Sequence, residues 1–190
     1  MRDVERNNLA EIQALNQRGG RTLSFVDLME AGTLNPEIVG FMLCSIAQGG
    51  SVLMGAGVSG AGKSTVLANV LCLLPPGERI VLARSASVVE SALRRPPTQP
   101  ECYLAHEIGE GRWRGYIWGI TVRNFFRLMD SNRRIASCLH ADTLEQTEQM
   151  LRAEPLLVDP QLLARLGLVG FVSFADGASG KRRLTHLYAR

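Results

Sequence analysis

The sequence lacks the long apolar segments of secreted and membrane-spanning chains. Residues 1–18 are mixed polar and charged, without the continuous apolar run of a signal peptide. No stretch of the chain reaches the ~20 apolar residues needed to cross a bilayer. We therefore expect a soluble, cytoplasmic protein, and a peripheral position at the inner face of a membrane stays open.

A strong excess of charge is also missing, and cysteines are few. The 21 Lys and Arg residues against 18 Asp and Glu residues give a net charge of +3, too balanced to indicate nucleic-acid binding through long-range electrostatics. The cysteines are widely spaced and form no C-x-x-C pair of the kind used for zinc or redox chemistry. Because they lie in apolar stretches, we expect buried free thiols at Cys44, Cys72, Cys102 and Cys138.

What the sequence does contain is an alternation of strand-like and helical segments. Short apolar runs predict strands at 51–54, 79–83, 102–105 and 135–139, and helical spacing predicts helices at 24–31, 36–48, 63–74, 116–129, 145–152 and 160–166. Such alternation is typical of an α/β fold with a mostly parallel sheet flanked by helices. Residues 168–174 and 184–188 predict a closing C-terminal β-hairpin across Asp176-Gly177.

The N-terminal segment differs in character from the rest of the chain. Leu9, Ile12 and Leu15 recur at helical spacing in an otherwise polar segment, and Gly19-Gly20 ends the pattern. We predict a polar N-terminal arm over residues 1–20, either an interaction arm or a fraying end, and one α/β domain over residues 21–190.

In the predicted 116–129 helix, the expected inward residues are Ile117, Ile120, Phe125 and Leu128.

A glycine-rich loop, residues 57–65, carries the clearest chemical motif. Its pattern fits G-x-x-x-x-G-K-[ST] at every fixed position, with an apolar strand before it and an apolar helix after it. Glycines let successive backbone N–H groups curl around phosphate oxygens, and the helix N-terminus adds a positive dipole end. We expect ATP, bound with Mg²⁺, to contact Gly57, Val58, Ser59, Gly60, Ala61, Gly62, Lys63, Ser64 and Thr65.

Two residues of this loop have specific predicted roles. Lys63 is expected to reach the β- and γ-phosphates, and the Ser64 hydroxyl is expected to be a Mg²⁺ ligand. The sequence does not rank ATP over GTP.

Segments around the loop match a known pattern, namely Thr22 to Leu28, Ser51 to Met54, Leu74 to Val81, Ala105 to Ile108, and Ser137 to Asp142. Together they resemble the P-loop ATPases of type II and type IV secretion, type IV pilus and tight-adherence systems, which have a RecA-like core. Glu107 falls at the family's Walker B strand end, and His140-Ala141-Asp142 falls at its histidine box. The resemblance covers nearly the whole chain. It implies a ring, six subunits in the family, that drives membrane-bound secretion or pilus machinery.

The chain departs from this family at an acidic pair whose glutamate activates the attacking water. Arg84 and Ser85 stand in those places. The stretch from there to Glu107 is also shortened, and we expect the family's separate N-terminal domain to be absent or reduced to the arm.

Glu107 and His140 are the predicted catalytic residues. A carboxylate just after an apolar strand can hold Mg²⁺ through water and orient the nucleophile, so Glu107 is also a predicted metal-site residue. A histidine at the carboxyl edge of a parallel sheet can hydrogen-bond a γ-phosphate or relay its presence to a neighbouring subunit. The plainer alternatives are a solvated loop glutamate and a satisfied core histidine. Glu90 and Glu110 are weaker candidates for the base.

Other side chains carry less specific signals. One of Arg123, Arg127, Arg133 and Arg134 is a candidate arginine finger, against ordinary ion pairs. For Trp113, Tyr116 and Trp118, packing in the core or an interface is favoured over stacking on adenine. His106 and His186 are expected to be structural. No set of His, Cys and carboxylates forms a metal cage of its own.

Two functions therefore stay open. The first is an ATP-hydrolysing motor subunit of the secretion and pilus-assembly type. The second is a nucleotide-binding regulatory or structural subunit with lost or weak hydrolysis, which the Arg84-Ser85 replacement favours. A small-molecule P-loop kinase is disfavoured because no arginine-rich lid is evident.

Overall fold

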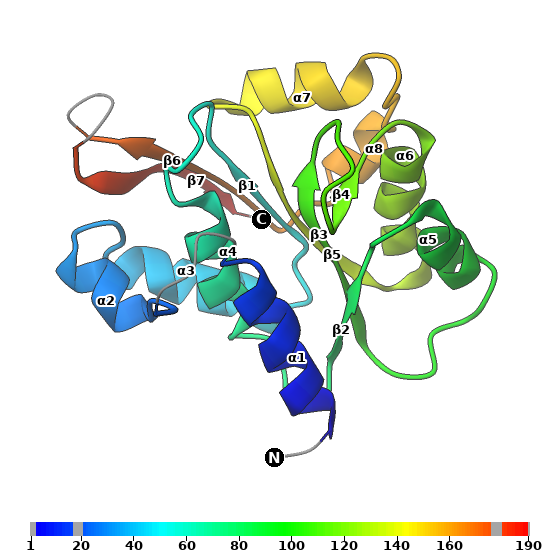
Figure 1. Ribbon diagram of the computed structural model, residues 1–190, viewed down its shortest axis with the longest axis horizontal. Helices are drawn as coiled ribbons and strands as arrows, with labels where there is room; N and C mark the ends of the chain where they lie inside the picture. Colours follow the sequence, from blue (N-terminus) through cyan, green and yellow to red (C-terminus); the bar gives the residue numbers. More distant parts are fainter. Residues whose placement is uncertain (1–2, 17–20, 176–179, 190) are drawn as a thin grey trace.

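The protein is described by a computed structural model over residues 3–16, 21–175 and 180–189. Within these ranges a seven-stranded sheet has the order β2-β3-β5-β1-β6-β7, and the short β4 also pairs with β3 (Figure 1). All pairs are parallel except the β6–β7 hairpin. The strands are β1 (Val52–Gly55), β2 (Arg79–Leu82), β3 (Glu101–Ile108), β4 (Tyr116–Ile117), β5 (Arg134–Leu139), β6 (Leu168–Phe174) and β7 (Arg182–Ala189).

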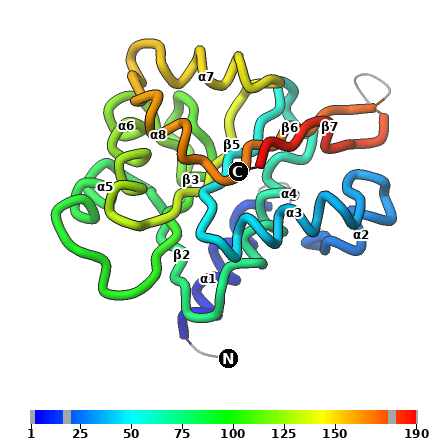
Figure 2. Tube along the Cα trace, turned by 180° about the vertical axis from the view of Figure 1, so that it is seen from behind, coloured from blue at the N-terminus to red at the C-terminus, as the bar shows by residue number. Residues whose placement is uncertain are grey.

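Helices cover both faces of the sheet (Figures 1 and 2). One core cluster joins the sheet to α1 (Asp3–Ala14), α2 (Phe25–Glu30), α3 (Pro36–Ala47) and α4 (Lys63–Leu71). The other joins it to α5 (Ala86–Leu93), α6 (Ile120–Arg127), the 3₁₀ turn η1 (Leu128–Ser131), α7 (Leu144–Arg152) and α8 (Pro160–Leu163). Neighbouring residues of one strand serve opposite cores, as Tyr103 and Leu104 of β3 do, because side chains alternate along a strand.

The predicted α/β class with a mainly parallel sheet and a C-terminal hairpin is confirmed. The turn at Asp176-Gly177 lies outside the described residues. The predicted 116–129 helix is wrong at its start, because Tyr116–Ile117 pairs with β3 and Gly119 (φ 59°) separates this strand from α6. Ile120 is therefore 54% exposed, whereas Ile117, Phe125 and Leu128 are buried as expected. The sequence patterns do not predict α5.

The prediction that all four cysteines are buried is wrong for two of them. Cys102 and Cys138 are buried on β3 and β5, and Cys44 and Cys72 are exposed. Burial raises the pKa of the Cys138 thiol to about 12, so this thiol is protonated at neutral pH.

The polar segment at the N-terminus is docked on the domain. The Asn8 side chain accepts a hydrogen bond from the Ile80 N–H (2.8 Å) and donates one to the Glu78 carbonyl (2.7 Å), as a neighbouring strand would do. Ile12 of α1 and Leu15, which follows the helix, are buried. Gly19-Gly20 lies outside the described residues, so the division at residue 20 stays a prediction. Every described helix is too short or too polar to cross a bilayer.

Candidate functional site

The strand order brings the ends of three strands together. β5 lies between β1 and β3, and all three are parallel. The glycine-rich loop follows β1, His140 follows β5, and Glu107 lies near the end of β3. Ligands of open α/β sheets bind at this carboxyl edge.

Two glycines of the glycine-rich loop adopt positive φ angles. Gly60 and Gly62 have φ angles of 85° and 109°. Residues with a Cβ atom rarely adopt such positive values, whereas glycine does so readily. Gly62 is the N-cap of α4, and no side chain caps that helix end. The first N–H groups of α4, from Lys63 onward, are therefore left for a bound anion.

Lys63, His140 and Glu107 contact one another at this edge. The Lys63 Nζ atom lies 3.3 Å from Glu107 Oε1 and 3.3 Å from His140 Nδ1. His140 Nε2 lies 3.2 Å from the same Oε1 atom. If the Lys63 ammonium donates to Nδ1, the ring proton lies on Nε2, the nitrogen that faces Glu107.

The Glu107 carboxylate is close to two partners yet poorly aligned with both. Its side chain is 8% exposed, and Oε1 forms no hydrogen bond of acceptable geometry despite the short distances to Lys63 and His140. Buried polar atoms in proteins are normally hydrogen-bonded. Oε1 is thus an acceptor available for a ligand or an ordered water.

A cavity of about 400 Å³ opens over these groups, a size within the range of small-molecule sites. Predicted site residues supply much of its lining, namely Ser59, Gly60, Gly62, Lys63, Ser64, Thr65, Glu107 and His140. Three predicted loop residues, Gly57, Val58 and Ala61, do not line it; the Ala61 side chain is buried and Val58 is 55% exposed. The apolar end of the cavity is built by Leu15, Leu23 and Ala68.

Two contacts to the glycine-rich loop are absent from the sequence predictions. Arg182, at the start of β7, donates from Nε to the Gly60 carbonyl (3.0 Å) and lines the cavity. Asp142 accepts a hydrogen bond from the Gly57 N–H (2.6 Å). A Cβ atom at Gly57 would displace that carboxylate, so glycine at this position allows the close contact. The histidine-box resemblance includes Asp142 but assigns it no such contact.

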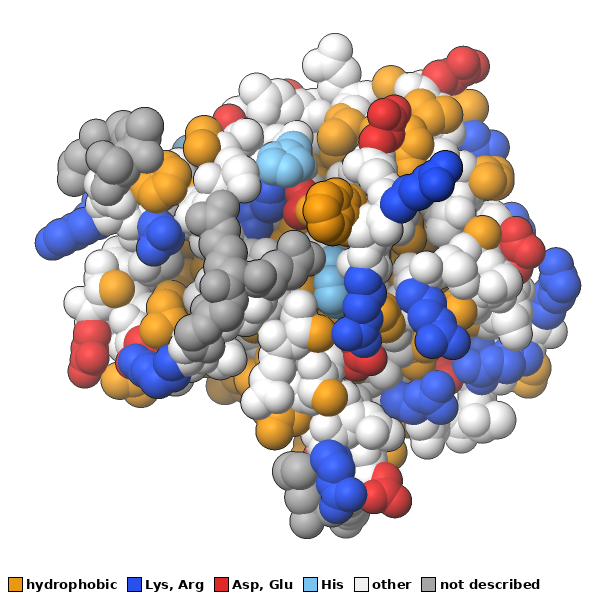
Figure 3. Space-filling view, viewed as in Figure 1, with side chains coloured by type: hydrophobic (Ala, Val, Ile, Leu, Met, Phe, Trp, Pro, Cys, Tyr) orange, Lys and Arg blue, Asp and Glu red, His pale blue; other side chains and the backbone are white. Residues whose placement is uncertain are grey.

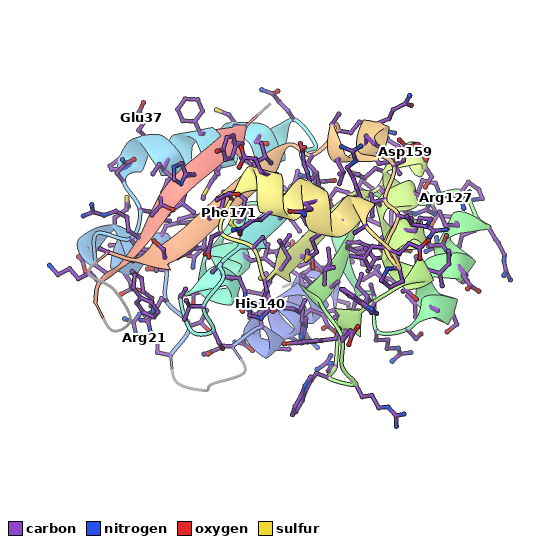
Figure 4. The ribbon with its side chains drawn as sticks, turned by 90° about the horizontal axis from the view of Figure 1, so that it is seen from above. Arg21, Glu37, Arg127, His140, Asp159 and Phe171 are labelled. Carbon is purple, nitrogen blue, oxygen red and sulfur yellow. The ribbon has the colours of Figure 1, made fainter. Side chains whose placement is uncertain are left out.

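The candidate arginine fingers lie elsewhere. Arg133 and Arg134 are buried in ion pairs with Glu101 (3.0 Å) and Glu78 (2.6 Å), so neither can reach a neighbouring subunit. Arg123 donates to the Leu156 carbonyl (3.1 Å). Figure 4, viewed from above, places the exposed Arg127 toward the right-hand side of the molecule, away from His140 near its middle.

The remaining histidine and carboxylate candidates also stay outside the cavity. Neither Glu90, paired with Arg94 (3.5 Å), nor Glu110 lines it. His106 is buried beside Gly115 with no hydrogen-bond partner for either ring nitrogen, and burial together with Arg114 lowers its pKa to about 4. Among the described residues, no cluster of His, Cys, Asp and Glu side chains could hold a metal ion alone.

The mainly parallel sheet with helices on both faces makes this a mixed α/β protein. Its fold resembles the structures of secretion ATPases. Over 99% of the chain, the fold is similar to that of the VirB11 ATPase from the Brucella suis type IV secretion system, with a TM-score of 0.57 and 16% identity. Over 80% of the chain, it is similar to the Legionella pneumophila ATPase DotB, with a TM-score of 0.50 and 15% identity.

These likenesses show the fold alone. The chain covers 62% of the VirB11 structure and 48% of the DotB structure. No protein-family model matches the chain, and no curated protein sequence does either.

Proposed function

We propose that this protein binds ATP and Mg²⁺ in the glycine-rich loop and hydrolyses the nucleotide as a motor subunit of the secretion-ATPase type. The observation that carries the proposal is the convergence of Lys63, His140 and Glu107 at a loop that ends in an uncapped helix N-terminus. The fold likeness to type IV secretion ATPases supports the same class.

In this proposal the phosphates occupy the turn between Gly57 and Thr65. Backbone N–H groups of the loop and of the first turn of α4 bind the phosphate oxygens. Lys63, already aimed into the cavity, binds the β- and γ-phosphates in exchange for part of its contact with Glu107. Arg182 adds a second cation from the opposite end of the chain.

The residues present fit a phosphate-bound Mg²⁺. This ion is usually held by one or two protein oxygens together with waters and substrate phosphates. The Ser64 hydroxyl lines the cavity, and the unaligned Glu107 Oε1 atom can bind one of the ion's waters. When bound, Mg²⁺ would neutralise charge on the phosphates during transfer.

Glu107 and His140 have separate roles in the proposed hydrolysis. Glu107 orients the attacking water and accepts its proton, because it is the only carboxylate among the described residues that line the cavity. His140, half exposed at the rim, has its Nε2 atom 3.2 Å from Glu107 Oε1 and can turn toward a γ-phosphate when one is bound. Its imidazole thereby links the state of the nucleotide to the position of the carboxylate.

The finer parts of the proposal rest on the family resemblance. They are assembly into a ring of six subunits, work on membrane-bound secretion or pilus proteins, a peripheral position at the inner face of the membrane, and the division into an arm (1–20) and a motor domain (21–190). Energy from hydrolysis would move that machinery.

A second candidate is a nucleotide-binding regulatory or structural subunit. Arg84 and Ser85, which replace the family's acidic pair, follow β2 and do not line the cavity. With that pair gone, Glu107 is the one carboxylate among the described lining residues that can activate water, and ATP would act as a structural switch if Glu107 does not suffice.

Steady-state phosphate release with MgATP separates these candidates. Glu107→Gln should lower turnover at least about 100-fold, since general bases contribute about 10²- to 10⁴-fold. Glu110→Gln, in the adjacent exposed loop, is the matched control and should leave turnover unchanged. Phosphate release that persists in Glu107→Gln would remove Glu107 from the mechanism. ATP binding without any turnover in the native chain would establish the regulatory candidate.

A further inference from the structure

The connection between β3 and β4 presents an exposed tryptophan. Trp113 is 73% exposed, the largest such value among the exposed large hydrophobic side chains described. The end of the connection is held in place, because the His106 N–H donates to the Gly115 carbonyl (2.8 Å) and the Tyr116 N–H donates to the Trp113 carbonyl (3.1 Å). Tryptophan and arginine are enriched among the hot-spot residues of protein interfaces, so this segment is a candidate contact surface.

Arginines surround this tryptophan. Arg112 and Arg114 flank it, and both are exposed. Arg114 pairs with Glu11 of α1 (3.1 Å), whereas no described carboxylate forms an ion pair with Arg112. Figure 3 shows Lys and Arg side chains gathered to the right of centre on the face viewed in Figure 1. An exposed indole with Arg112 beside it favours a partner that offers an apolar recess with a carboxylate next to it.

The chain itself carries such a recess on another face. A hollow of about 150 Å³ lies among α7, α8 and the hairpin strands, and its apolar lining includes Leu144, Leu163, Leu166, Val169 and Tyr188. A cavity of this volume admits an aromatic ring. α8 and the end of β7 are turned toward the viewer in Figure 2, the side opposite that of Figure 1.

Charged groups beside the hollow complement the tryptophan segment. Glu148 lines it, and Glu145 is exposed one turn earlier on α7, so carboxylates are available to Arg112 of an incoming segment. Arg152 also lines the hollow and can lie over the face of an inserted indole as a cation–π partner.

We propose that Trp113 of one copy inserts into the α7–α8 hollow of a second copy. The two surfaces are different parts of the chain, so each copy can both donate a tryptophan and accept one, and the contact is heterologous. Repetition of this contact builds a ring or a filament. Because the tryptophan segment directly follows β3, the contact places a neighbouring subunit next to the strand end that carries Glu107.

Sedimentation velocity over a range of concentrations tests this contact. Trp113→Ala should raise the dissociation constant for self-association by at least about tenfold, as loss of a hot-spot residue does. Ala164→Arg changes an exposed residue that lines the hollow, and it should have the same effect by obstructing it. Phe41→Ala, which removes a 54% exposed aromatic side chain from α3, is the control and should associate like the native chain.

Mixing the two defective variants gives the sharper result. Trp113→Ala keeps its hollow and Ala164→Arg keeps its tryptophan, so the mixture should form one-to-one pairs and nothing larger. Native association by either variant, or a native chain that stays monomeric at every concentration, would overturn the proposal. So would a monomeric native chain that binds phosphatidylglycerol vesicles through Trp113, which would assign the residue to a lipid surface.

This contact is separable from nucleotide chemistry. Both variants should bind MgATP by calorimetry as the native chain does, because neither residue lines the nucleotide cavity. Loss of ATP binding in the native chain would contradict the proposed function and leave the self-association result standing.

Discussion

The Asp142 carboxylate holds the first residue of the glycine-rich loop through a 2.6 Å hydrogen bond from the Gly57 N–H. Asp142 comes two residues after His140, so one short segment after β5 contacts both the entry of the loop and the Lys63–Glu107 pair. The position of the loop is therefore coupled to the end of β5.

Removing this tether should loosen the loop. Asp142→Ala is expected to weaken MgATP binding by about tenfold, because a hydrogen bond to a charged group contributes about 1.5 to 3 kcal/mol. Asp142→Asn keeps an acceptor oxygen and removes a negative charge near the phosphates, so it should bind at least as tightly as the native chain. Titration calorimetry of both variants checks the order, and equal loss in the two would contradict the tether.

Arg182 should contribute to nucleotide affinity from the C-terminal hairpin. Arg182→Ala is expected to weaken MgATP binding by about tenfold, since charge-assisted hydrogen bonds to phosphate are among the stronger ones. Arg183→Ala is the matched control, because neighbouring residues of a strand point to opposite faces and Arg183 does not line the cavity. Similar affinities for the two variants would exclude Arg182 from the site.

Asn8 should stabilise the docked α1 helix. Asn8→Ala removes the hydrogen bonds to Ile80 of the edge strand β2 and to Glu78 just before it, and we expect the free energy of unfolding to fall by about 1 to 3 kcal/mol. Asn7→Ala, on the exposed side of the same helix, should change it far less. Urea denaturation followed by circular dichroism compares them. Equal stability of the two variants would mean that Asn8 does not hold the helix.

His106 should make the fold sensitive to mild acid. Its pKa falls from 6.5 to about 4 on folding, so between these values the unfolded chain binds a proton that the native chain does not. Stability is therefore complete above pH 6.5 and declines as the pH falls toward 4, by at most about 3 kcal/mol. His106→Leu should flatten this decline, and His186→Leu, at an exposed position, should not. An unchanged pH profile in His106→Leu would assign the acid sensitivity to other groups.

Local patterns in the sequence predict the elements of the fold well, because apolar periodicity and glycine punctuation act over a few residues. Phe125 and the helix after Lys63 follow from such patterns. These patterns do not predict β4, because two residues are too few to show a period. Ile120 is exposed because the helix begins only after Gly119, so its buried face differs from that expected for a helix that starts at Tyr116.

The assembly of the site depends on longer-range geometry. Glu107 and His140 meet because β5 enters the sheet between β1 and β3, and strand order does not follow from local pattern. Arg182 reaches Gly60 from 122 residues away, through a hairpin whose position is set by packing of the whole domain. The family resemblance assigns Glu107 and His140 to motifs of the nucleotide site in advance and says nothing of Arg182.

Calorimetric titration of MgATP into the native chain and into Lys63→Ala tests the central claim most directly. Lys181→Ala, a change at the chain's other lysine, serves as the control because Lys181 does not line the cavity. We predict binding by the native chain and by Lys181→Ala, and a loss of at least about tenfold in affinity, or no detectable binding, in Lys63→Ala. Tight MgATP binding that survives in Lys63→Ala would contradict the assignment of the glycine-rich loop as the phosphate site.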